Sequence, residues 1–383
     1  MNLLAGLKLF CVSTLLTAVF PPLAHALDRT VLIGYAAPMS GVSAAAGPAL
    51  VQAAEIAIDD LNLQAIHLKG DRLVFKLLVQ DDRSDPRTGL LVAQYFVKSE
   101  VIGVIGHWNS GVGIPASRIY SEAGLVQIAQ GTTAHSYTQQ GFSTAYRIVP
   151  HDDVSASYTA DYVTHEMKAR RIAVIDDGTP FGGGFAKQFM DSAKAMQADI
   201  VSQFSISNHT SDFNAILRAI QENKPDVVVF GGVDIQGAQL VREMRRFNLD
   251  MPLIGASGTV APQFLEQAGA AGNGTIVLEP GQPSYQGPQW QHFQKIYKSH
   301  LSGAMSSYAP FSYDAVQVFA EAIRKANSLD RQAIAVSMRQ IRHNGLTGRI
   351  GFDAEGNLLN PVYTIFQMRN QQWVPLKTIS SKN

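Results

Sequence analysis

Cysteine is almost absent from this chain of 383 residues, since Cys11 is the only one. The rest of the chain therefore offers neither a disulfide nor a cysteine-based metal site. Lysine plus arginine and aspartate plus glutamate both total 31, so no net charge would attract nucleic acid. The sequence also lacks an HExxH motif and any close histidine pair. We accordingly predict no metal site, no cofactor and no nucleic-acid partner.

The motifs of common enzymes are missing as well. The sequence contains no GxxxxGK[ST], and its first predicted strand leads into Pro38-Met39-Ser40-Gly41 rather than into GxGxxG. The segment Gly255-Ala256-Ser257-Gly258 is too short for a GxSxG nucleophile elbow. These absences predict a protein that is not an enzyme. An exported hydrolase remains an alternative, which turnover of candidate solutes by the purified protein would reveal.

Residues 1–26 have the layout of a secretory signal peptide. Lys8 supplies a positive charge, Leu9–Phe20 is an apolar run, and Ala24-His25-Ala26 is an A-x-A cleavage pattern. The run is too short to span a bilayer as a helix. The residues before Cys11 make a poor lipidation motif. We expect cleavage after Ala26 and a soluble, exported product.

Short apolar strands alternate with amphipathic helices from Val31 onward. Val101–Ile105 is apolar throughout, as a buried parallel strand requires, and Asp85-Pro86 is typical of a helix start. This alternation predicts an α/β fold with parallel sheets covered by helices. The predicted strands are 31–37, 73–80, 101–105, 125–129, 171–176, 200–205, 226–231, 252–255, 275–278, 348–352 and 361–369, and the predicted helices are 48–62, 85–99, 113–122, 181–197, 212–223, 235–248, 260–268, 286–300, 310–327 and 330–342.

There are too many strand–helix units for one sheet of ordinary size, so we expect two doubly wound lobes. The alternation restarts after Pro150, and two late strands are expected to return to the second sheet. One lobe is predicted from residues 27–150 and 281–348, and the other from residues 151–280 and 349–383.

Small and hydroxylated residues follow two neighbouring predicted strands, where ligands bind in doubly wound folds. The segment Gly106–Gly113 contains Ser110 and leads into a helix, whose N-terminus favours an anion. The next strand is followed by Gln130-Gly131-Thr132-Thr133. Together these segments predict a neutral cradle for a carboxylate, although ordinary capping by serine and threonine explains each segment alone. Trp108, beside this cradle, is either a core residue or a wall of the ligand site.

An ordered set of markers along nearly the whole chain after residue 26 resembles the periplasmic leucine/isoleucine/valine-binding proteins. The markers are Met39-Ser40-Gly41, Asp59-Asp60-Leu61-Asn62, Asp81-Asp82, Asp85-Pro86, Val104-Ile105-Gly106-His107, Pro115-Ala116-Ser117, Thr132-Thr133-Ala134, Phe181-Gly182, Gly231-Gly232 and Phe352-Asp353. The resemblance implies a type I periplasmic binding protein, with two Rossmann-like lobes joined by a three-crossover hinge. Such a protein traps a solute by hinge closure and delivers it to the membrane permease of an ABC importer.

The resemblance also implies roles for residues of the cradle. Ser110 and Thr133 would hold the α-carboxylate of an amino acid, and Gly131 would offer its backbone. We expect a monomer in the periplasm that binds a branched-chain amino acid or a related small carboxylate. A ligand-sensing protein of the same fold, acting on a receptor or regulator, is the alternative. The full set of predicted ligand-binding residues is Ala46, Trp108, Asn109, Ser110, Gly131, Thr132, Thr133, Phe181, Val233, Asp234 and Ser257.

Several positions depart from the pattern of the family. Ser257 stands where an acid usually pairs with the ligand ammonium, and a buried ammonium without a countercharge is costly. Either Asp234 or another acid replaces it, or the ligand lacks an amine. Ala46 and Val233 stand where tyrosines are frequent, which would enlarge the pocket, although Trp108 could refill part of it and Phe181 would close it from the second lobe.

A frequent disulfide of the family is lost as a pair, because its two positions correspond to Ser84 and Asn109.

Overall fold

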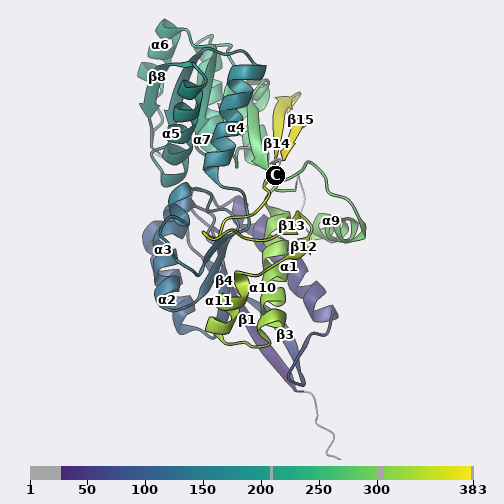
Figure 1. Ribbon diagram of the computed structural model, residues 1–383. Coiled ribbons are helices and arrows are strands. Elements are labelled where there is room, and N and C mark those ends of the chain that lie inside the picture. The colour runs from purple at the N-terminus through teal and green to yellow at the C-terminus, as the bar shows by residue number, and fades with distance from the viewer. Residues whose placement is uncertain (1–26, 208–209, 301–304, 381–383) are drawn as a thin grey trace, which may run out of the picture.

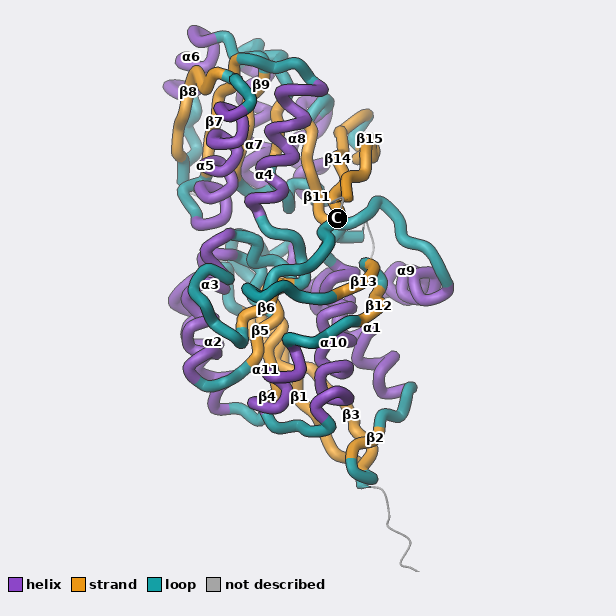
Figure 2. The backbone as a smooth tube through the Cα atoms, viewed as in Figure 1, coloured by secondary structure: helices purple, strands orange, loops and turns teal. Residues whose placement is uncertain are grey.

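The computed structural model describes residues 27–207, 210–300 and 305–380. Figure 1 shows two lobes, each a sheet flanked by helices, and Figure 2 shows loops passing between them. Parallel pairing dominates both sheets, which confirms the predicted α/β class. The predicted signal peptide lies outside the described residues. Within the described part, none of the helices combines the length and apolarity needed to cross a membrane.

The sheet of the first lobe has the order β2-β3-β1-β4-β5-β6. β1 lies between β3 and β4 and pairs with both in parallel, so its residues are largely buried. The elements are β1 (Asp28–Ala37), α1 (Ala46–Leu63), β2 (His67–Leu68), β3 (Asp71–Asp81), α2 (Pro86–Lys98), β4 (Val101–Ile105), α3 (Ser110–Glu122), β5 (Val126–Ala129), η1 (His135–Tyr137) and β6 (Ala145–Arg147).

The sheet of the second lobe has the order β15-β14-β11-β10-β9-β7-β8. β7 to β11 pair in parallel, whereas β14 and β15 add an antiparallel edge. The elements are α4 (Asp152–Asp161), η2 (Tyr162–Glu166), β7 (Arg171–Asp176), α5 (Pro180–Ala195), β8 (Asp199–Ser205), α6 (Asn214–Asn223), β9 (Val227–Gly231), α7 (Asp234–Arg246), β10 (Leu253–Gly255), α8 (Pro262–Ala268), η3 (Gly269–Gly272), β11 (Ile276–Pro280), β14 (Val362–Arg369) and β15 (Gln372–Ser380).

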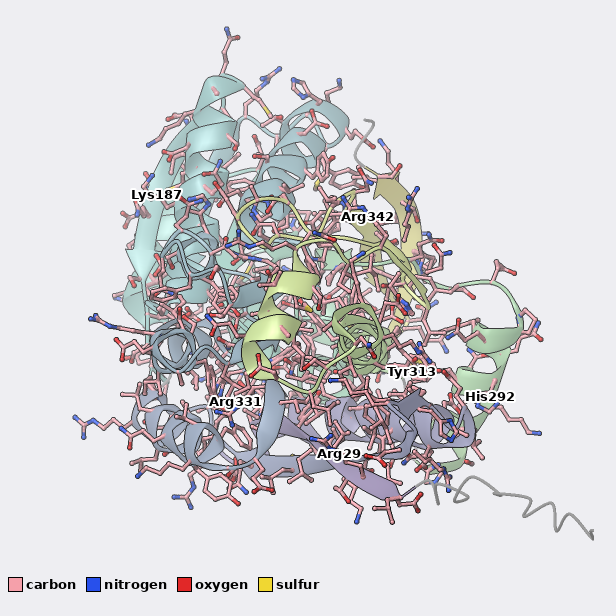
Figure 3. The ribbon with its side chains drawn as sticks, turned by 60° about the horizontal axis from the view of Figure 1, so that its bottom comes forward. Arg29, Lys187, His292, Tyr313, Arg331 and Arg342 are labelled. Atoms are coloured by element: carbon pink, nitrogen blue, oxygen red, sulfur yellow. The ribbon has the colours of Figure 1, made fainter. Side chains whose placement is uncertain are left out.

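Three late helices return to the first lobe: α9 (Pro288–His300), α10 (Ala309–Ala326) and α11 (Arg331–Met338). The carboxylate of Asp60 on α1 accepts a hydrogen bond from the hydroxyl of Tyr313 (2.8 Å) and contacts His292 Nε2 (2.9 Å). Figure 3 labels both partners on α9 and α10, together with Arg331 at the start of α11. Polar contacts therefore add to a shared apolar core between α1 and α10.

One predicted strand differs from the structure. Gly348–Phe352 was expected to join the second sheet, but β13 (Gly348–Ile350) pairs only with β12 (His343–Gly345) in a separate two-stranded ribbon. Ile350 and Phe352 are buried in the core of the first lobe, so burial of these side chains fixes the ribbon there. Only β14 and β15 return to the second sheet. The predicted lobe boundaries themselves stay a prediction.

Candidate functional site

A cavity of about 340 Å³ lies between the two lobes, at the carboxyl ends of parallel strands. This is where doubly wound sheets bind their ligands, and the volume suits a small molecule. Predicted residues from both lobes line it: Trp108, Asn109, Ser110, Gly131 and Thr133 from the first, and Phe181, Val233 and Ser257 from the second.

The first-lobe side of the cavity is built around the N-terminus of α3. Ser110 begins this helix, whose first turn leaves backbone N–H groups without intrahelical partners. The Ser110 hydroxyl oxygen accepts a hydrogen bond from the N–H of Ala134 (3.3 Å). The hydroxyl proton therefore remains available to donate into the cavity. Together with the helix N-terminus, this donor favours an anion at this end.

Thr133 lines the same end of the cavity, and within the described residues its buried hydroxyl, like both carboxyl oxygens of the buried Asp152, has no hydrogen-bond partner. Burial raises the pKa of Asp152 to about 7, so this carboxyl is partly protonated near neutral pH.

Buried polar contacts fix the two loops that carry Ser110 and Thr133. Arg147, fully buried on β6, donates to the carbonyls of Thr133 (2.6 Å) and Ala134 (3.0 Å). Thr132 points away from both cavities described here, because its hydroxyl donates to the carbonyl of His107 (2.9 Å). The structure thus places Thr132 in the contact between the two loops and outside the lining of either cavity.

Asn109 is the residue immediately before the first turn of α3, and it lines the cavity. Its side-chain amide donates to the hydroxyl of Ser43 (2.9 Å), and the N–H of Ser43 donates to the hydroxyl of Ser84 (3.1 Å). Ser43 therefore connects Ser84 and Asn109, the two positions at which the resemblance implied a lost disulfide. The side-chain oxygen Oδ1 of Asn109 is buried with no hydrogen-bond partner among the described residues.

Aromatic side chains form the apolar walls. Trp108 packs edge-on against Tyr308, with ring centroids 4.4 Å apart, and Phe181 faces the cavity from the start of α5. Gly131 makes room for Trp108, because a Cβ atom at this glycine would lie 2.3 Å from the indole ring. Trp108 is therefore a wall of the cavity as well as a neighbour of the first-lobe core.

A second cavity, of about 190 Å³, lies on the other side of Trp108 and Tyr308. Ala46 and Asp234 line this second cavity and not the main one, whereas Val233 lines both. This second cavity lies beside Ala46 and Val233, the two small residues at positions where tyrosines are frequent in the family. Trp108 only partly fills it.

Three acids with raised pKa values lie near the second-lobe side of the main cavity, and two of them, Asp177 and Glu279, are buried. Asp177 lines the cavity itself, and burial raises the pKa of its carboxyl. Burial also raises the pKa of Asp234, in the second cavity, to about 6. Glu279 supports the Ser257 loop by accepting hydrogen bonds from the N–H groups of Gly258 (2.7 Å) and Val260 (3.1 Å), and burial raises its pKa to about 7.

Sequence reasoning missed Asp177, Tyr308 and Glu279. Asp177 follows a buried strand at the same topological position as the predicted loops, a signal that could have identified it. Tyr308 comes from a late helical region far away in sequence, so only the fold brings it to Trp108.

Comparison with known proteins yields concordant matches. A family model described as "Periplasmic binding protein" matches residues 30–372. The Leu/Ile/Val-binding protein homolog 1 of Brucella suis is 30% identical over 338 residues, which cover 88% of this chain and 90% of that protein.

Solved structures share the fold. The branched-chain amino acid transporter substrate binding protein LivJ from Streptococcus pneumoniae, in complex with isoleucine, superposes with a TM-score of 0.84 at 22% identity, covering 92% of this chain and all (100%) of that one. A solute binding protein from R. palustris, in complex with benzoate, gives a TM-score of 0.81 at 19% identity, covering 93% and 98%.

Proposed function

This chain belongs to the family of periplasmic binding proteins, and from this premise we propose that it is the solute-binding component of an ABC importer. Its solute is an amino acid or a related small carboxylate with an apolar body, captured between the two lobes. The family binds substrates for transporters and does not catalyse reactions, in agreement with the absence of enzyme motifs in the sequence.

The observation that carries the proposal is the position of Ser110. A hydroxyl donor at a helix N-terminus faces a cavity whose opposite walls are aromatic and aliphatic. Two of the similar solved structures are complexes, one with isoleucine and one with benzoate, and both of these ligands have a carboxylate and an apolar body. The same two features match the two ends of this cavity, with the carboxylate at Ser110 and Thr133 and the body against Trp108, Phe181 and Tyr308.

The acids decide whether an ammonium group is also recognised. Ser257 brings no charge to the main cavity, but Asp177 also lines it, and an ionised Asp177 carboxylate would compensate a ligand ammonium. If Asp177 serves this purpose, the ligand is an amino acid. If it remains protonated because of its burial, the ligand is a carboxylic acid without an amine.

A ligand panel tests the carboxylate and the ammonium separately. We would measure thermal shifts of the mature protein with leucine, leucinamide, 4-methylpentanoate and benzoate. A ligand at about 100 times its Kd adds about 2.7 kcal/mol of stability, which gives a readable upward shift. We expect at least one acid to bind and leucinamide to fail. Binding of leucinamide as tight as that of leucine would contradict the carboxylate site.

Export and hinge closure complete the proposal. We propose cleavage after Ala26, action in the periplasm as a monomer, and delivery to a membrane permease. The predicted lobes, residues 27–150 plus 281–348 and residues 151–280 plus 349–383, would close over the solute, with Ile350 and Phe352 moving with the first lobe, in whose core they are buried. N-terminal sequencing of the mature protein should begin at Leu27, and loss of the gene should abolish uptake of the bound solute. Uptake that is unaffected would favour a sensing role instead.

A further inference from the structure

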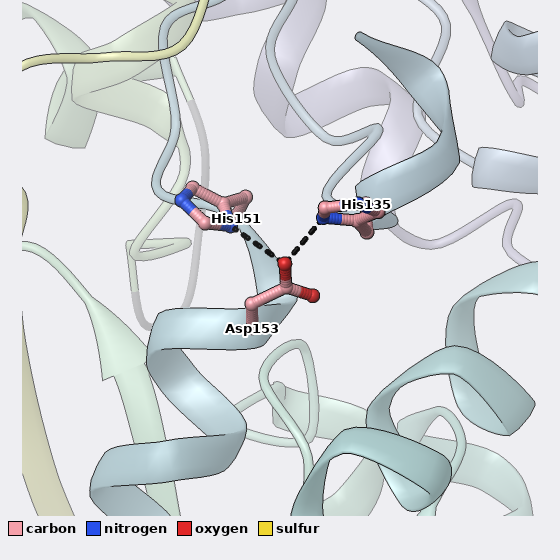
Figure 4. A group of neighbouring side chains, drawn as sticks. All are labelled: His135, His151 and Asp153. Carbon is pink, nitrogen blue, oxygen red and sulfur yellow. Dashed lines mark ion pairs between the residues drawn. The ribbon is translucent and has the colours of Figure 1, made fainter. Parts of the chain in front are cut away.

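Two histidines and an aspartate converge at the first crossover between the lobes. His135, His151 and Asp153 each offer one ligand atom, and these three atoms lie within 4.8 Å of one another. Both imidazole Nδ1 atoms face Oδ2 of Asp153, which pairs with His135 and lies 3.8 Å from His151 Nδ1 (Figure 4). Both histidine side chains therefore point to the same carboxylate oxygen, and the three possible ligand atoms already lie close together.

The backbone holds the three residues in place from both sides of the crossover. His135 starts η1 directly after the loop that carries Thr133, whereas His151 and Asp153 sit at the N-terminus of α4. The carbonyl of His151 accepts a hydrogen bond from the Tyr363 hydroxyl (2.9 Å), and the N–H of Asp152 donates to the carbonyl of Thr133 (3.0 Å). The cluster is thus anchored to the first lobe, to the crossover and to β14.

We propose that His135, His151 and Asp153 form a binding site for a zinc-like divalent transition metal. Two imidazole nitrogens and one carboxylate oxygen are ligands that Zn²⁺ accepts, with water in the fourth tetrahedral position. The side chains are accessible to water, being 55%, 24% and 27% exposed in that order. Sequence analysis predicted no metal site because the histidines belong to different elements and form no local motif.

The convergence of three ligands distinguishes this cluster from ordinary surface pairs. His165 contacts Asp161 (2.8 Å) and His292 contacts Asp60 (2.9 Å), but within the described residues neither pair is part of such a three-ligand group. These two histidines are therefore matched controls for weak, adventitious metal binding. A bound metal would connect a first-lobe residue to the first helix of the second lobe, and so restrain the hinge.

The test is calorimetric titration of the untagged mature protein with Zn²⁺ alone, without solute. We expect one Zn²⁺ per chain. Affinity should fall in His135→Gln, His151→Gln and Asp153→Asn by more than the roughly 10- to 100-fold that loss of an outer-shell partner costs. His165→Gln and His292→Gln should leave it unchanged. Anomalous diffraction at the zinc edge should place the ion between the three side chains.

Two results would overturn the site: no stoichiometric Zn²⁺ binding by the wild type, or binding that His165→Gln or His292→Gln weakens as much as His151→Gln does. Circular dichroism without metal checks that each variant folds, and the half-exposed His135 provides a variant with little risk to the fold. The proposal is independent of the proposed function, because the titration contains no solute and failure of the ligand panel would not affect it.

Discussion

At the scale of single residues, Ser110 uses its hydroxyl group in two directions. The oxygen accepts the N–H of Ala134, which ties the α3 loop to the Thr133 loop, while the proton is left for the cavity. A donor that is already oriented by the protein costs little to order when a ligand arrives. Ser110 should therefore supply a large share of the affinity for a carboxylate.

Replacing Ser110 by alanine should weaken solute binding without unfolding the protein. A hydrogen bond to a charged group is worth roughly 1.5–3 kcal/mol, so Kd should rise about 10- to 150-fold. Calorimetry with the tightest acid of the panel measures this. Ser117→Ala is the control, because Ser117 is buried on the same helix but donates to the carbonyl of Ile114 (2.7 Å). Equal losses in both variants would point to a general disturbance of α3.

Glu279 is a buried acid that holds the Ser257 loop in place. Oε1 accepts both backbone N–H groups of the Ser257 loop, and Oε2 accepts the hydroxyl of Ser307 (3.0 Å). Burial raises its pKa from 4.5 to about 7. The folded chain therefore retains this proton to a higher pH than the unfolded chain does, and its contribution to stability is lost as pH rises from about 4.5 to about 7.

Glu279→Gln should remove this pH dependence and keep the geometry, because the amide oxygen can accept the same two N–H groups. We expect the variant to gain stability relative to wild type between about pH 4.5 and about pH 8. Thermal unfolding across that range measures the difference. Glu266→Gln, at an exposed glutamate on α8, should show no such trend. A difference between Glu279→Gln and wild type that does not vary with pH would refute the raised pKa.

At the scale of elements, the pattern of apolar residues predicted the central, buried strands of each sheet better than the strands at the sheet edges. β4 and β7 match their predicted ranges, because strands that are buried on both faces have continuous apolar runs: the whole of β4 and residues 172–175 of β7. β15 was missed because it lies at a sheet edge, where most of its side chains are exposed and carry no pattern. The predicted strand Gly348–Phe352 was assigned to the wrong sheet, because the pairing of β13 with β12 is set by tertiary burial and not by local sequence.

The candidate site was predictable only in part, because the sequence places loops at a sheet edge but does not fix the direction of each side chain. Ser110 and Thr133 follow strands, so their loops could be placed at one sheet edge from the sequence. Asp234 belongs to the second cavity and Thr132 to a loop contact, and neither could be known without the direction of each side chain.

Arg331 offers a test of how α11 is held on the first lobe. Its guanidinium donates to the carbonyls of Val97 (3.2 Å), Ser99 (2.6 Å) and Val101 (3.0 Å), where α2 turns into β4. Arg331→Ala should lower the free energy of unfolding by about 1–3 kcal/mol, because these carbonyls lose a charged donor. Denaturant unfolding measures it.

Arg324→Ala is the control on α10. Arg324 contacts Gln64 and Glu321 at exposed positions, and such surface changes usually stay within about 0.5 kcal/mol. A loss for Arg331→Ala no larger than that of Arg324→Ala would show that the apolar face of α11 suffices to hold it.

At the scale of the whole molecule, the cavity belongs to neither lobe alone. The donors come from the first lobe, whereas Phe181, Val233 and Ser257 come from the second. A solute that touches both walls stabilises the arrangement in which the walls are close, and this differential contact is what can drive closure. We propose that the cleft in this way converts solute binding into a change of shape that a membrane permease recognises.

The most direct test of this account is a crystal structure of the protein with the tightest-binding acid of the panel. The account predicts the ligand carboxylate within hydrogen-bond distance of Ser110 Oγ and Thr133, with the apolar body against Trp108 and Phe181 and contacts from both lobes. A carboxylate that faces the second lobe, or a ligand bound outside the cavity between the lobes, would contradict it.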